Sequence, residues 1–148
     1  NYHKHGIKSK RSFGIIFSTS GEFLFSKKKE SMELVALLST GKGSWGQVAG
    51  LMKKGEWEKI IIVGTSFAKD FTVAGIPFDF VEFDSDKSLV QLKKDLEKKL
   101  KGRFDGLEVA LSIASGNGKE HMALQSALLS IPVGVRFTAL TNDGVVML

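Results

Sequence analysis

Three short polar turns contain most of the side chains in this sequence that could bind an anionic ligand. Each follows a run of apolar residues, and they occupy residues 39–44, 64–66 and 115–119. Glycines in such turns let backbone amides approach a phosphate closely, and a helix that follows adds partial positive charge at its first turn. Lys42 and Lys119 add full positive charges. The turns therefore predict an anion site, although glycine-rich turns also serve simply as tight connections between strand and helix.

We expect residues of these turns and their immediate neighbours to hold the ligand. The candidates are Ser39, Thr40, Gly41, Lys42, Gly43, Ser44, Trp45, Gly64, Thr65, Ser66, Ser115, Gly116, Asn117, Gly118, Lys119 and His121. Two of them also have a purely structural interpretation. Trp45 can pack in the core instead of stacking on a base, and His121 can hydrogen-bond the neighbouring loop instead of contacting a ligand.

The familiar nucleotide and metal motifs do not occur in the sequence. Gly41-Lys42-Gly43-Ser44 lacks the spacing of a P-loop, and no G-x-G-x-x-G follows the first strand of the body. Glu120 and His121 are adjacent, so on a helix they point about 100° apart and form no metal-binding face. The chain has no Cys, which excludes disulfides and thiolate metal ligands. We expect neither a metal nor a cofactor.

The elements that position these turns alternate between strand and helix from Glu33 onward, as in a parallel sheet flanked by helices. Apolar runs predict strands at 34–38, 59–63, 78–83 and 107–113, and apolar spacings of three and four predict helices at 45–54, 87–101 and 119–130. Ser85 is the expected N-cap of the second helix.

The end of the chain predicts a C-terminal β-hairpin, because Thr141-Asn142-Asp143-Gly144 separates two apolar runs. The expected fold class is therefore α/β, with a Rossmann-like, mostly parallel sheet. In open sheets of this kind ligands bind beyond the carboxyl ends of the strands, where the strand order reverses. All three polar turns should open on that one edge.

The first 31 residues differ from the rest in charge. They hold seven Lys and Arg against two acids, whereas residues 32–148 hold 14 of each. A neutral body lacks the broad basic surface that binds duplex DNA. Apolar runs at 13–17 and 23–25 predict a hairpin appendage. We divide the chain into a basic leader, 1–31, which is an appendage or an over-long start, and a ligand-binding domain, 32–148.

The composition predicts a soluble, cytoplasmic protein. Hydrophobic residues make up 43% and charged residues 25% of the chain, and no apolar run approaches the roughly 18 residues of a membrane span. The start does not have the pattern of a secretory signal.

The order of elements, the Ser/Thr-Gly loop after the first strand and the late glycine-lysine turn before an apolar helix resemble the CRISPR-associated Rossmann-fold (CARF) domains and their archaeal relatives. The resemblance covers about residues 32–148 and is carried by residues 39–45 and 115–121. In that family the turn is usually Gly-Gly-x-Lys-x-Met. This chain has Gly116-Asn117-Gly118-Lys119-Glu120-His121-Met122, with one extra residue between Lys and Met.

The resemblance implies a homodimer in which two ligand edges surround one cavity for a cyclic oligoadenylate, in CRISPR-associated antiviral defence. Our leading hypothesis is a dimeric nucleotide-binding or sensing domain. The alternative is a metal-independent ring nuclease, in which an adenosine 2′-hydroxyl attacks the adjacent phosphate, Lys119 stabilises the developing charge and Ser44 orients the phosphate. A third hypothesis is a single-stranded RNA-binding protein that uses the basic leader, with stacking surfaces at Phe13, Phe17, Phe23 and Phe25.

Overall fold

A six-stranded sheet with the order β5-β4-β3-β6-β7-β8 forms the centre of the protein. Its strands are β3 (Met32–Leu38), β4 (Trp57–Gly64), β5 (Asp79–Glu82), β6 (Glu108–Ser112), β7 (Gly134–Thr141) and β8 (Gly144–Met147). The first five are parallel, and β8 runs antiparallel to β7. The structure is a computed structural model that describes residues 13–17, 23–27 and 32–148.

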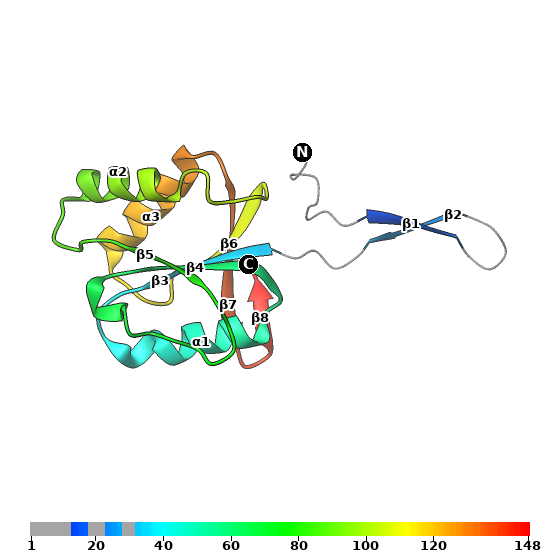
Figure 1. The fold of residues 1–148 in the computed structure, drawn as a ribbon, viewed down its shortest axis with the longest axis horizontal. Helices are drawn as coiled ribbons and strands as arrows, with labels where there is room; N and C mark the ends of the chain where they lie inside the picture. The colour runs from blue at the N-terminus through cyan, green and yellow to red at the C-terminus, as the bar shows by residue number, and fades with distance from the viewer. Residues whose placement is uncertain (1–12, 18–22, 28–31) are drawn as a thin grey trace.

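Helices cover both faces of this sheet (Figure 1). On one face lies α1 (Trp45–Lys54), and on the other α2 (Leu89–Leu100) and α3 (Gly118–Ser130) pack against each other. Alternate residues of β3 reach opposite faces: Leu34, Ala36 and Leu38 lie in the core with α1, whereas Val35 and Leu37 lie in the core with α2 and α3. Because both faces are covered, the central strands are apolar without interruption, as the sequence indicated.

The strand order reverses between β3 and β6. The chain leaves β3 through α1 to reach β4 on one side, and β6 pairs with the other side of β3. Since α1 and α3 lie on opposite faces, the loops that lead into them run toward opposite faces beyond this point. This is the position at which open α/β sheets form a ligand crevice.

The expected fold class is confirmed, including the C-terminal hairpin, whose Gly144 has a φ of 99°. The N-cap predicted for α2 was wrong, and several other predicted bounds differ from those of the structure by one or two residues. The N-cap of α2 is Ser88, not Ser85. The Ser88 hydroxyl accepts from the backbone N–H of Gln91, and Gln91 Oε1 accepts from the backbone N–H of Ser88. None of the helices in the described part of the chain has both the length and the apolar character needed to cross a membrane.

The N-terminal hairpin is also confirmed, as β1 (Phe13–Phe17) paired antiparallel with β2 (Phe23–Lys27) in a sheet of their own. Residues 1–12, 18–22 and 28–31, with most of the leader's positive charge, lie outside the described residues. The division of the chain at residue 31 stays a prediction.

Candidate functional site

The loops that follow β3 and β6 are joined directly at the reversal point. The backbone N–H of Ser39 donates to Ser115 Oγ over 2.9 Å, and both residues are buried. This hydrogen bond crosses 76 positions of sequence. The first and third polar turns are therefore one structural unit, as the convergence of the turns on one edge required.

Glu120 fixes this unit to the start of α3. Glu120 is only 1% exposed. Its carboxylate accepts hydrogen bonds from the Ser39 hydroxyl (3.1 Å) and from the backbone N–H of Asn117 (3.0 Å). In return, Asn117 Oδ1 accepts from the Glu120 amide at 2.9 Å, which completes a capping box. Glu120 was not among the candidate site residues, yet the Asn-x-x-Glu spacing of a capping box could have revealed its role.

His121 takes the structural role that the sequence left open for it. Its Nε2 lies 2.7 Å from the carbonyl oxygen of Ser115, so the imidazole holds the turn that precedes α3. Gly116, the next residue of that turn, has a φ of 100°, and a Cβ on it would overlap Leu37 Cδ2. The turn is therefore locked, and only glycine fits at position 116.

Four other glycines leave open space around the same edge. Apart from the adjacent residues and the local helix backbone, no atom lies within 4 Å of the place where a Cβ would stand on Gly41, Gly43, Gly46 or Gly118. Gly41 to Gly46 belong to the loop after β3 and the start of α1, and Gly118 is the first residue of α3. Their backbone is thus accessible on both sides of the reversal point, as a phosphate site needs.

Lys119 is tied to the loop between β5 and α2. Its Nζ donates to the carbonyl oxygens of Ser85 (2.7 Å) and Lys87 (2.8 Å). An ammonium group has three N–H donors, so these bonds use two of them. The side chain therefore links the start of α3 to a third loop at this edge, a contact that local sequence patterns do not indicate.

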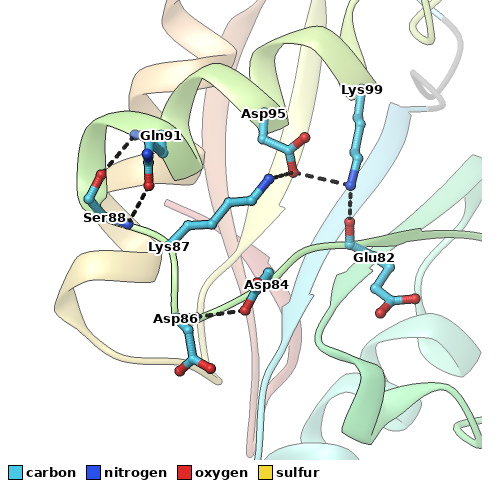
Figure 2. A network of polar contacts seen from close by, with 8 residues as sticks. All are labelled: Glu82, Asp84, Asp86, Lys87, Ser88, Gln91, Asp95 and Lys99. Atoms are coloured by element: carbon cyan, nitrogen blue, oxygen red, sulfur yellow. Dashed lines mark hydrogen bonds and ion pairs between the residues drawn. The ribbon is translucent and has the colours of Figure 1, made fainter.

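That loop is itself held in place by polar contacts (Figure 2). The Asp86 amide donates to Asp84 Oδ1 at 2.9 Å, and Asp95 on α2 pairs with Lys99 at 3.1 Å and with Lys87 at 3.8 Å. Lys99 also donates to the carbonyl oxygen of Glu82 at 2.8 Å. The carbonyl oxygens that accept hydrogen bonds from Lys119 therefore belong to a segment that is itself held by hydrogen bonds and ion pairs.

Trp45 packs as the structural interpretation expected. Its ring makes edge contacts with Phe71 (5.5 Å between centroids) and Phe67 (6.0 Å), and Lys42 Nζ lies 5.3 Å from its centre. Ser44, immediately before it, begins α1 without a side-chain cap hydrogen bond. Trp45 and Ser44 are therefore close to the open loop, with the Trp45 ring used mainly for packing.

The turn after β4 lies beside the loop after β3. The Thr65 amide donates to the Leu38 carbonyl at 3.4 Å, and a Cβ on Gly64 would come within 2.8 Å of that same oxygen. Thr65 is buried, and its hydroxyl has no hydrogen-bond partner among the described residues, whereas Ser66 is exposed. The three turns follow the neighbouring strands β4, β3 and β6 and so share one edge.

Candidate metal ligands are not grouped in this region. Within residues 32–148, where side chains are described, no three His, Asp or Glu side chains lie together as a metal site would require. The donors at this edge are backbone amides, hydroxyls and lysine ammonium groups, which suit an anion.

The fold and these loops define a Rossmann-like α/β domain with an open edge at the reversal of strand order. Several solved structures share this fold, including the two that follow. One is Can2 from Sulfobacillus thermosulfidooxidans in complex with cyclic tetra-adenylate (cA4), at a TM-score of 0.52 and 13% identity over 78% of this chain. The other is protein VC1899 from Vibrio cholerae, at a TM-score of 0.55 and 15% identity over 79% of this chain.

The chain spans about a third of the length of both proteins, 33% in each case. No protein-family model matches the sequence, and the comparison with curated proteins gives no match. At these identities the likeness shows the fold alone, and what the CARF resemblance implies beyond the fold stays a prediction.

Proposed function

We propose that this chain is a nucleotide-binding domain that senses a cyclic oligoadenylate. The observation that carries the proposal is the joined pair of loops at the strand-order reversal, with open glycines on both sides. The fold that holds these loops is shared with about a third of Can2, a protein whose structure is in complex with cyclic tetra-adenylate. A cyclic oligoadenylate has several phosphates in a ring, so its binding site needs several groups that can each contact a phosphate.

The phosphate contacts are assigned to the start of α3 and the loop after β3. Gly118 leaves its backbone open at the first turn of α3, where amide groups carry partial positive charge. The next residue, Lys119, donates two of its N–H groups to the carbonyl oxygens of Ser85 and Lys87, which leaves a third N–H for a phosphate. Across the reversal point, the exposed residues Thr40, Lys42 and Gly43 supply a hydroxyl, a cation and an open amide.

A homodimer completes the site in this proposal. The outer face of α3 exposes Met122 (57%) and Leu129 (67%), which line a hollow of about 320 Å³ with His121, Gln125 and their neighbours. A helix that is apolar around most of its surface needs a partner on its outer side. In this homodimer the two copies of α3 must lie side by side in the same direction, because this arrangement brings the two Gly118 ends together so that one ring can contact both copies.

Sensing is favoured over cleavage by the position of Lys119. Its ammonium donates two N–H groups to carbonyl oxygens and keeps one for a phosphate, whereas a lysine that stabilises the charge of a transition state directs its donors at the reacting phosphate. Ser44 and Lys119 remain the catalytic candidates of the ring nuclease alternative.

Incubation with radiolabelled cyclic tetra-adenylate separates the alternatives. Unchanged ring retained with the protein on a filter supports sensing, and a linear product identifies a ring nuclease. Absence of both binding and product rejects the proposed ligand.

The single-stranded RNA alternative depends on a leader that lies largely outside the described residues. If that alternative is correct, removal of residues 1–31 must eliminate RNA affinity.

A further inference from the structure

The loop after β4 carries an exposed aromatic side chain at the ligand edge. Phe67 lies in a short 3-10 turn, Ser66–Ala68, and is 47% exposed between the buried residues Thr65 and Ala68. Among the large apolar side chains exposed in residues 32–148, it is the only aromatic one. Because β4 neighbours β3, Phe67 stands next to the loop that begins at Ser39.

This exposed ring is held by a chain of aromatic contacts that begins in the core. Phe71 is buried and contacts both Phe78 (5.8 Å) and Trp45 (5.5 Å), and Trp45 in turn contacts Phe67 at 6.0 Å with an interplanar angle of 66°. An edge-to-face contact of this kind covers at most one face of each ring. The Phe67 ring is therefore held by Trp45 and keeps one face for a further contact.

A cation accompanies the aromatic pair. Lys42 Nζ lies 5.3 Å from the centre of the Trp45 ring, and its neighbour Gly43 has open space at its backbone. Aromatic rings beside a positively charged groove are the combination with which proteins bind unpaired nucleotides, because every base has a face to stack and every nucleotide has a phosphate.

The spacing along the edge suits a nucleotide. Phe67 lies in the loop after β4 and Gly118 after the turn that follows β6, with β3 between these strands. Along the sheet edge the two positions are therefore at least two strand spacings apart, or about 10 Å. We infer that Phe67, supported by Trp45, is the surface on which a nucleobase of the bound oligonucleotide stacks while its phosphate lies toward α3. The inference rests on the proposed function and assigns its base-binding residue.

Tryptophan fluorescence and affinity test the inference. The sequence contains two Trp, and Trp57, at the amino end of β4, is replaced by Phe so that emission reports Trp45 alone. In this background we expect cyclic tetra-adenylate to change Trp45 emission. Phe67→Ala should weaken its affinity about ten-fold or more, whereas Phe67→Tyr, which keeps a ring, should preserve it.

Ribose 5-phosphate is the matched ligand without a base, and Phe67→Ala should leave its weak binding unchanged. Val90→Ala, at an exposed apolar position on α2, is the control variant and should bind cyclic tetra-adenylate as the parent does. Equal affinity of the parent and Phe67→Ala for cyclic tetra-adenylate overturns the stacking inference and leaves the proposed function intact. Failure of the parent to bind cyclic tetra-adenylate rejects both.

Discussion

Two glycines separated by one residue have different tasks in the turn before α3. Gly116 has a φ of 100°, and a Cβ on it would overlap Leu37. Gly118 lies in the helix, and beyond its own helix backbone and neighbours no atom lies within 4 Å of the place where a Cβ would stand. The first glycine is required by the fold. The second is required only if a ligand must approach its backbone. Substitution of Gly116 should therefore affect stability, and substitution of Gly118 should affect binding.

Gly116→Ala should lower the free energy of unfolding by about 1–3 kcal/mol, because a residue with a Cβ is strained at this φ and would press on Leu37. Urea denaturation measures the change. A variant as stable as the parent would show that the turn relaxes without cost.

Gly118→Ala should keep or slightly raise stability, by up to about 1 kcal/mol, because alanine loses less conformational entropy than glycine in a helix. In contrast, its affinity for cyclic tetra-adenylate should fall, since the added methyl group occupies the approach to the first amides of α3. Titration of the folded variant provides the measurement. Unchanged affinity would mean that no phosphate approaches this residue.

Glu120→Ala should cost about 2 kcal/mol of unfolding free energy, because the Ser39 hydroxyl and the backbone N–H of Asn117 both lose a buried acceptor. Glu120→Gln, which keeps one acceptor oxygen, should be less destabilising. If thermal denaturation ranks the two variants in the opposite order, the carboxylate does not hold the loops together.

At the scale of elements, the loop between β5 and α2 depends on a side chain from α3. Lys119→Met removes the donor that the carbonyls of Ser85 and Lys87 share, so amide hydrogen exchange at residues 83–88 should become faster. Lys94→Met, at an exposed position on α2, is the matched control. Equal exchange in both variants would contradict the link between α3 and this loop.

Local patterns predicted most of these elements, because each depends on nearby residues. The apolar spacing gave α1 its full extent, 45–54, and the strands their order along the chain. The start of α2 was misplaced because Ser85 and Ser88 are both acceptable caps by type, and the Gln91 side chain decides between them.

Contacts between residues far apart in the chain could not be predicted from the sequence. The Ser39 to Ser115 hydrogen bond and the Lys119 contacts join positions 76, 34 and 32 residues apart, so no local spacing encodes them. The exposure of Phe67 was missed for the same reason, since it depends on how Trp45 and Phe71 pack. The ligand roles of the candidate residues stay predictions.

At the scale of the whole molecule, the outer face of α3 determines the expected assembly. Leu129→Glu should produce monomers, because a carboxylate buried in the interface without a partner is costly. Leu107→Glu, at the most exposed large apolar side chain of the described residues, should leave the dimer unchanged. Sedimentation velocity distinguishes the two. A parent protein that is monomeric at every concentration would contradict the proposed face.

Isothermal titration of the purified chain with cyclic tetra-adenylate tests the central claim most directly. The two joined loops and the α3 face predict saturable binding of one ring for every two chains. The same titration with Gly118→Ala should show weaker binding at the same ratio. Absence of heat or saturation with the parent protein would contradict the assignment of this edge as a cyclic oligoadenylate site.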